Sequence, residues 1–329
     1  MSYDIITFGS AAQDIHVKSE AFKIEGKGIC LPFGSKIEVE DVVFTSGGGG
    51  TNTAVAFAKQ GFRTAFCGAI GADMSGLEII RDLKHLLVDT RFVVKKKEKH
   101  TNYSIVMSNN SGERTILVYR GASDLVEQKD VKWNKVKKTS WFYLAPLGSP
   151  KSADEGGVGL FGALVDFAKE NKINIAINPS KQQLSMPENE LKNIFRKVDI
   201  LFLNQEEASF LTKIPRGQEG EMFKKISEFC SGIIVITKGV EGVVVADEKY
   251  IYSAGTNPNR KIVDTTGAGD SFASGFLSDY IRQNGSIEKA IQLGIANSEA
   301  CLSEIGAKNG LLDKNSKFIP VQVVKTEIN

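Results

Sequence analysis

Short runs of apolar, β-branched residues alternate along the chain with segments of helical periodicity. In segment 158–171, for example, Leu160, Leu164 and Phe167 recur at helical spacing. Strands that alternate with helices predict an α/β fold, with a mainly parallel sheet covered by helices on both faces. Ligands bind beyond the carboxyl ends of the strands in such a sheet. The clearest strand-like runs are Asp4–Gly9, Ser140–Leu144, Asn174–Asn178, Ile200–Asn204 and Ile233–Thr237.

The N-terminal half also contains strands in which apolar and polar residues alternate. Thr101–Ser108 and Arg114–Tyr119 flank a glycine-containing turn and predict a hairpin. Ser35–Phe44 and Arg91–Val94 have a similar character. We therefore expect one domain over residues 1–329 that carries a small second sheet, made from segments inserted at about 15–45 and 91–120. A lid over an active site and an extra edge sheet both fit this pattern.

The composition is that of an ordinary globular protein. Among 329 residues, 41 are Lys or Arg and 39 are Asp or Glu, so the net charge of +2 creates no field to attract nucleic acid or an anionic membrane. Without a signal-peptide pattern or a long apolar stretch, a cytoplasmic protein with no nucleic-acid or membrane partner is expected. The four cysteines are widely separated, which argues against a CxxC metal site and a disulfide framework.

The strongest local signal lies at 261–283, where the letters DTTGAGD precede a run of helical periodicity. This order predicts a strand, a glycine loop and a helix. Backbone N–H groups of Gly267, Ala268 and Gly269 at the helix start would cradle a phosphoryl oxyanion. Asp270 fits both a helix N-cap and a base that accepts a substrate hydroxyl proton. We favour the base, because the acid and the glycine loop occur together at a strand end.

A second glycine segment, at 46–52, opens another helical run. Its four consecutive glycines let a ligand approach the backbone closely. Neither glycine segment fits the P-loop pattern GxxxxGK[ST] or the dinucleotide pattern GxGxxG. The HRD and DFG signatures of protein kinases are also missing.

Taken together, the two glycine segments resemble the signatures of the PfkB/ribokinase family of sugar and nucleoside kinases. The letters GGxxxN at 47–52 are similar to the family's N-terminal signature, and DTTGAGD at 264–270 with Gly275 to its C-terminal one. The resemblance implies a ribokinase-like fold with a β-lid over the sugar, which in many members is also a dimer surface. It further implies ATP-dependent phosphorylation of a sugar hydroxyl, with Asp270 as the base.

The resemblance also assigns roles to single residues. Asn204 and Glu207 fit equally an Asn-capped helix with a surface acid. Arg120, at the end of a lid strand, suits an anionic substrate if it points into the site, and otherwise faces solvent. The implied substrate residues are Asp14, Gly47, Gly48, Asn52 and Arg120, and the implied ATP residues are Asn204, Thr237, Gly239, Gly242 and Asn297. Glu207 would organise magnesium through water. A monovalent cation such as potassium would be surrounded by Asp264, Thr266 and Gly306, with Cys301 and Glu304.

Two departures from the ribokinase pattern argue against ribose as the substrate. Ala12 stands where ribokinases carry Asn, and a Glu that follows their lid is replaced within 144–147. A nucleoside kinase of the same family is one alternative, and a catalytically inactive sugar or nucleotide sensor is another. Retention of Asp270, the glycine loop and Glu207 favours an active kinase.

Overall fold

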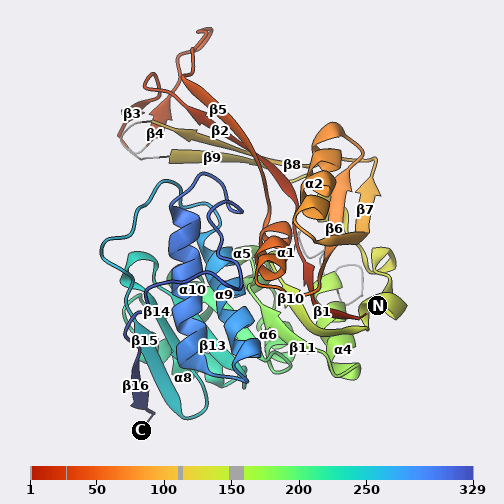
Figure 1. The fold of residues 1–329 in the computed structure, drawn as a ribbon, viewed down its shortest axis with the longest axis vertical. Helices are drawn as coiled ribbons and strands as arrows, with labels where there is room; N and C mark the ends of the chain where they lie inside the picture. The colour runs from red at the N-terminus through yellow and green to blue at the C-terminus, as the bar shows by residue number, and fades with distance from the viewer. Residues whose placement is uncertain (1, 27, 110–113, 148–158, 329) are drawn as a thin grey trace.

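A computed structural model describes residues 2–26, 28–109, 114–147 and 159–328 (Figure 1). Ten strands form the main sheet, in the order β16-β15-β14-β13-β12-β11-β10-β1-β6-β7. In this order, neighbouring strands from β13 through β12, β11, β10, β1 and β6 to β7 pair in parallel. Strands β14, β15 and β16 extend the sheet through antiparallel pairs. The bounds are β1 Tyr3–Phe8, β6 Thr64–Gly71, β7 Asp89–Lys96, β10 Thr139–Leu144, β11 Asn174–Ile177, β12 Ile200–Asn204, β13 Ile233–Thr237, β14 Val243–Ala246, β15 Tyr250–Ala254 and β16 Val324–Glu327.

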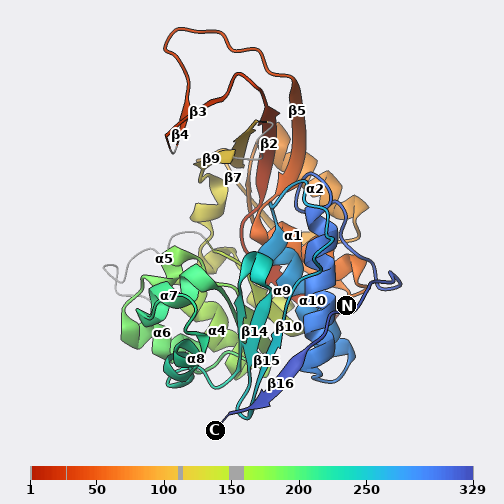
Figure 2. The same cartoon turned by 90° about the vertical axis from the view of Figure 1, so that its left-hand side faces the viewer.

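Helices cover both faces of this sheet, as the buried strands require. On β10, Phe142 and Leu144 belong to one core, whereas Trp141 and Tyr143 belong to the other, because successive side chains point to opposite faces. Helices α4 to α8 lie on the first face, and α1, α9 and α10 lie on the second (Figure 2). The bounds are α1 Gly49–Lys59, α2 Met74–His85, α3 Trp133–Val136, α4 Leu160–Glu170, α5 Lys181–Leu184, α6 Glu188–Phe195, α7 Gln205–Thr212, α8 Glu219–Ser227, α9 Ala268–Arg282 and α10 Ile287–Leu302.

A separate four-stranded sheet stands above the main body (Figure 1). Its order is β5-β2-β8-β9, and we call it the lid. The bounds are β2 Ala12–Lys18, β5 Asp41–Gly47, β8 Asn102–Ser108 and β9 Arg114–Tyr119, and a two-stranded ribbon, β3 Lys23–Glu25 with β4 Gly28–Cys30, lies between β2 and β5 in the chain. The mainly parallel sheet and the small second sheet expected from the sequence are thus confirmed. The turn of the predicted hairpin, at 110–113, lies outside the described residues.

Three details of the expected fold were wrong. Arg91–Val94 belong to β7, which pairs with β6 at the edge of the main sheet, because an edge strand with one solvated face alternates as a lid strand does. The second lid segment therefore begins at Asn102. In the first segment, residues 35–40 are not in a strand. The expected strand before the DTTGAGD motif is a loop, anchored where Val263 N donates to Leu302 O at 2.7 Å.

Two further expectations concern the chain as a whole. That residues 1–329 form a single domain stays a prediction. Across the described ranges, none of the helices has both the length and the apolar character needed to span a bilayer.

Candidate active site

Asp270 lies in the first turn of α9, and its carboxylate does not cap the helix. The N-cap is Gly267, and Asp270 is the third helical residue. Its Oδ2 instead accepts a hydrogen bond from Asn52 Nδ2 at 2.9 Å. Burial raises the pKa of Asp270, against the opposing effects of the Asn52 hydrogen bond and the charge of Lys308. A carboxylate with a raised pKa at a cavity wall is suited to accept a proton.

Gly267 brings the start of α9 into a conformation that only glycine adopts easily. Its φ is +78°, and a Cβ at this position would overlap Ala307. The first N–H groups of a helix have no intrahelical partner, and the helix dipole adds positive potential there. Such a helix start can hold an anion, and the sequence resemblance assigns this role to the backbone of Gly267, Ala268 and Gly269.

A cavity of about 260 Å³ separates the lid from this helix start, and Asp14, Asn52, Arg120, Gly267 and Asp270 are among the residues that line it. Asp14 is 4% and Asn52 5% exposed. Asn52 Oδ1 is buried without a hydrogen-bond partner among the described residues. A buried acceptor without a hydrogen bond costs free energy, so a donor group on a bound ligand would stabilise this atom. Adjacent acceptors on Asp14 and Asn52 fit the hydroxyl groups of a sugar.

Gly48 lines this substrate cavity, and Gly47 packs directly against Asp14. A Cβ on Gly47 would overlap the Asp14 carboxylate, so only glycine lets Asp14 take its position. Gly48 is the N-cap of α1 and lines the cavity. Burial raises the pKa of Asp14, whereas a hydrogen bond from Ser104 and the charge of Lys308 act in the opposite direction.

A second cavity, of about 210 Å³, lies on the other side of the same helix start. It is lined by Thr237, Gly239, Gly242, Ala268 and Gly269, among others. Thr237 ends β13, so this cavity also opens at the carboxyl edge of the main sheet. The first turn of α9 thus forms a wall common to two cavities, one bearing the predicted substrate residues and the other the predicted nucleotide residues.

Asn297, a nucleotide residue implied by the resemblance, is not among the residues that line this cavity. It is fully buried, its Nδ2 donates to Ser271 O at 2.7 Å, and its Oδ1 accepts from Leu312 N at 2.9 Å. Because both ends of the amide are satisfied by the backbone, Asn297 ties α10 to α9. The next residues along α10, Ser298 and Glu299, line the nucleotide cavity instead.

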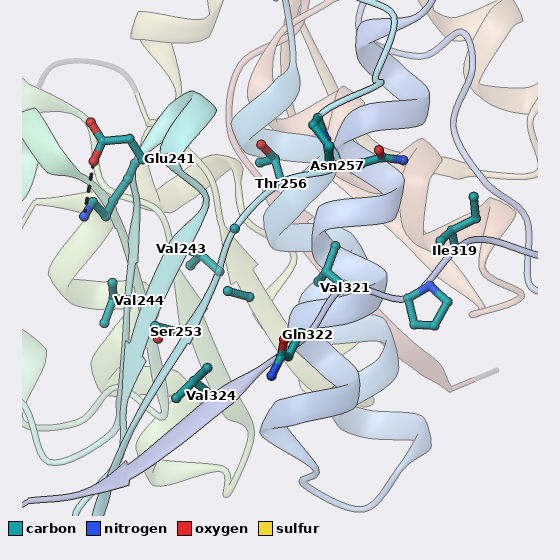
Figure 3. A pocket seen from close by; sticks show the side chains of 15 residues that line it. Glu241, Val243, Val244, Ser253, Thr256, Asn257, Ile319, Val321, Gln322 and Val324 are labelled. Carbon is teal, nitrogen blue, oxygen red and sulfur yellow. Dashed lines mark ion pairs between the residues drawn. The ribbon is translucent and has the colours of Figure 1, made fainter.

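A third hollow, a groove of about 640 Å³, adjoins the nucleotide cavity at Thr256 (Figure 3). It lies between β14, β15 and the C-terminal segment around Val321, and Lys238 and Glu241 form an ion pair of 3.3 Å at its rim. None of the described residues that line it belongs to the predicted site.

Comparison with known proteins agrees with this geometry. The family model described as pfkB family carbohydrate kinase matches residues 3–315. The chain belongs to the pfkB family of carbohydrate kinases. Ribokinase from Staphylococcus aureus is 30% identical over 288 residues, which cover 84% of this chain and 88% of the relative.

Solved structures share the ribokinase-like fold that the sequence predicted. Arabidopsis thaliana ribokinase complexed with ribose and ATP matches with a TM-score of 0.79 at 22% identity, over 95% of this chain and 97% of that one. Adenosine kinase from Sinorhizobium meliloti matches with a TM-score of 0.76 at 23% identity, over 95% of this chain and 98% of that one. The fold therefore accommodates both sugar and nucleoside kinases.

The Asn204–Glu207 segment of this pfkB kinase forms a capping box at the start of α7. Asn204 Oδ1 accepts from Glu207 N, and Glu207 Oε2 accepts from Asn204 N, each at 2.8 Å. The helix cap that the sequence also allowed for Asn204 is thus present. It occupies only one carboxylate oxygen of Glu207, and burial raises the pKa of this half-buried acid.

The implied monovalent-cation site would rest mostly on backbone carbonyls, and the Asp264 carboxylate itself is already occupied by hydrogen-bond donors. Its Oδ1 accepts from Thr266 N at 2.9 Å, from Thr266 Oγ1 at 2.8 Å and from Arg114 Nη1 at 3.0 Å, and its Oδ2 accepts from Gly306 N at 2.9 Å. The carbonyl of Thr266 faces the Cys301 thiol, with Sγ 3.6 Å from the oxygen. Although burial alone would raise it, the hydrogen bonds from Gly306 and Thr266 hold the pKa of Asp264 below its usual value.

Lys308 is a site residue that the sequence reasoning missed. It is 7% exposed, and its Nζ donates to Ser46 Oγ at 2.9 Å. Burial lowers its pKa to about 8, and the charges of Asp14 and Asp270 oppose that change. A single lysine in a loop after α10 carries no local signal, because its environment comes from the lid and from α9.

Replacement of Lys308 with Met is expected to move the acid limb of kcat/KM to higher pH. A nearby positive charge favours the ionised carboxylate, so its removal raises the pKa of Asp270 further, and the base acts only when ionised. A pH–rate profile of each variant measures this. The control is Lys59→Met, which removes a half-buried lysine that contacts the Lys308 carbonyl. An acid limb unchanged in Lys308→Met would contradict the assignment.

Proposed function

We propose that this protein transfers the γ-phosphoryl group of ATP to a primary hydroxyl of a neutral monosaccharide. The observation that carries the proposal is the first turn of α9, which forms part of both cavities. Gly267 and Asp270 line the substrate cavity, whereas Ala268 and Gly269 line the nucleotide cavity. A hydroxyl and a terminal phosphate bound on the two sides would meet at this turn.

The chemistry follows from that meeting point. Asp14 and Asn52 orient the sugar, and the Asp270 carboxylate takes the proton of the attacking hydroxyl. The hydroxyl oxygen bonds to the γ-phosphorus while the bond to the bridging oxygen of ADP breaks. Backbone N–H groups at the start of α9 stabilise the charge that develops on the transferred phosphoryl group.

The charge of the cavity favours a neutral sugar over an anionic one. Asp14, Asp124 and Asp270 face the substrate cavity against the single exposed cation Arg120. Even with the buried Lys308 acting on Asp14 and Asp270, three acids against two cations disfavour a carboxylate or phosphate on the substrate. The cavity of about 260 Å³ is also smaller than most ligand sites, which are commonly ~300–1,000 Å³. That size favours a monosaccharide over a nucleoside.

An ADP-release screen of neutral hexoses and pentoses, sugar acids, sugar phosphates and nucleosides tests the proposal. We expect turnover with a neutral sugar. Preference for a nucleoside would instead support the nucleoside-kinase alternative. Binding of ATP and a sugar without ADP release with any candidate would favour the sensor. Arg120→Ala is expected to leave selectivity for neutral sugars in place.

Magnesium is the implied metal, and Glu207 is the residue proposed to organise it. Among the described residues, no cluster of three or more His, Cys, Asp or Glu side chains could hold a metal. One remaining carboxylate oxygen fits an ion that keeps most of its waters and binds phosphate oxygens. When bound, such an ion would neutralise phosphate charge.

Glu207→Gln is therefore expected to raise the magnesium concentration needed for half-maximal turnover and to lower the maximal rate. The matched control is Glu206→Gln, since Glu206 is an exposed neighbour paired with Arg216. Magnesium titrations of the three proteins measure the difference. Identical titrations of Glu207→Gln and wild type would leave Glu207 with its capping role alone.

The lid is proposed to join two copies of the chain. Its outer face presents one apolar row across all four strands, formed by Phe44, Ile15, Ile105 and Leu117, with Phe44 64% and Leu117 53% exposed. Two copies of such an exposed apolar face can pack against each other about a two-fold axis. Light scattering should give a dimer mass for wild type and a monomer mass for Phe44→Glu, while Met74→Glu, on exposed α2, should remain dimeric. A monomeric wild type would contradict the proposal.

The cytoplasmic location expected from the sequence also belongs to the proposal, and fractionation of the source cells would test it.

A further inference from the structure

The lid contacts the anion-hole loop through a buried carboxylate. Arg114, the first residue of β9, places Nη1 3.0 Å from Asp264 Oδ1. His16, on β2, places Nδ1 3.8 Å from Asp264 Oδ2, and its Nε2 lies 3.1 Å from Thr45 Oγ1 on β5. The Asp264 side chain is 9% exposed. Two lid strands therefore contact one acid of the main body directly, and a third supports His16.

The same acid shapes the loop that precedes α9. Its Oδ1 accepts from both the N–H and the hydroxyl of Thr266, which immediately precedes Gly267. Its Oδ2 accepts from Gly306 N, and Gly306 packs against Thr45 of the lid. A cation that holds the Asp264 side chain in place therefore also orders the backbone segment that leads into the anion hole.

We propose that Arg114 takes the place of a monovalent cation, so that the lid itself orders the anion-hole loop and the kinase works without potassium. A guanidinium group stays charged at all relevant pH values and offers a planar set of donors to a carboxylate. Because it is tethered to the lid, its effective concentration at Asp264 does not depend on the salt in solution. A potassium ion at the same carboxylate would meet a like charge.

Arg114 is in this view a positioning residue, which acts on the anion hole through Asp264. Activity in KCl is compared with activity in N-methylglucamine chloride at equal ionic strength, and wild type is expected to be equally fast in both. Arg114→Ala should lose about tenfold in the organic salt, the scale of one charge-assisted hydrogen bond. It should regain most of that loss in KCl, because the ion can then reach Asp264. Arg114→Lys should keep the independence from potassium.

The control for lid charge is Lys18→Ala. Lys18 is exposed and lies in the same row of the lid as Arg114, with Ser108 between them. Its removal should leave both the rate and the salt response as in wild type. A wild-type enzyme that needs potassium, or an Arg114→Ala variant with a normal rate in both salts, would overturn the inference.

The activity measurements rest on the proposed function, so a second measurement is independent of it. Thermal unfolding midpoints of wild type should agree in the two salts, whereas the midpoint of Arg114→Ala should rise with KCl concentration as an ion bound to the folded state requires. If no sugar is phosphorylated but these midpoints behave as stated, the proposed function fails and the inference stands. A potassium-dependent rise in the wild-type midpoint would overturn it.

Discussion

Replacing Asp270 with Asn is expected to lower kcat by at least ~100-fold, the usual scale of positioned acid–base catalysis. The amide is nearly the same size and still meets Asn52, so the fold and ligand binding should be kept. The side chain can no longer accept the hydroxyl proton. Steady-state rates, together with sugar and ATP binding by calorimetry, measure the two effects separately.

The contrasting variant is Asp14→Asn, which removes the same charge from the same cavity. Asp14 is proposed to bind sugar hydroxyls, so its loss should act mainly on KM for the sugar, whereas Asp270→Asn should act mainly on kcat. Since burial raises the pKa of Asp270, wild-type activity should also fall on the acid side at a pH above the ordinary range of an aspartate. Near-normal turnover of Asp270→Asn would remove it as the base.

Replacing Gly267 with Ala should produce the second large loss, in both stability and turnover. The left-handed φ of +78° and the overlap of a Cβ with Ala307 force the loop before α9 to move. Displacement of even one anion-hole donor commonly costs ~10²–10³ in kcat. Turnover and the thermal unfolding midpoint should therefore both decrease.

Gly269→Ala separates the two contributions. A Cβ at this position meets no atom within 4 Å, and its φ is not in the left-handed region. The unfolding midpoint of Gly269→Ala should therefore match that of wild type, even though Gly269 lines the nucleotide cavity. Equal midpoints and equal turnover for Gly267→Ala and wild type would show that the anion hole does not depend on this turn.

Much of the candidate site could be predicted because its signals are local. The glycine segments at 46–52 and 264–270 read as helix starts within a few residues, and both open helices in the structure. The continuous apolar run on β10 likewise requires a sheet covered on both faces, because successive side chains point to opposite faces. Such features are set by residues that are close together in the sequence, so they can be predicted from the sequence alone.

Other features depended on the tertiary structure. Arg91–Val94 alternates as a lid strand does, yet pairing with β6 places it in the main sheet. Lys308 has no informative neighbours in sequence, and only packing buries its ammonium group beside two acids.

The surroundings of Asp264 also could not be predicted from the sequence. The family resemblance placed Asp264 at a possible monovalent-cation site, but a local pattern does not show which side chains surround the residue in the folded chain. Arg114 lies 150 residues from Asp264 in sequence and reaches it only because the lid folds over the helix start. The sequence alone determined the family and located the helix start that carries the proposed base Asp270. The packing of the lid on the main body decided which cation the buried acid meets, because charge pairing across 150 residues is a property of the folded chain.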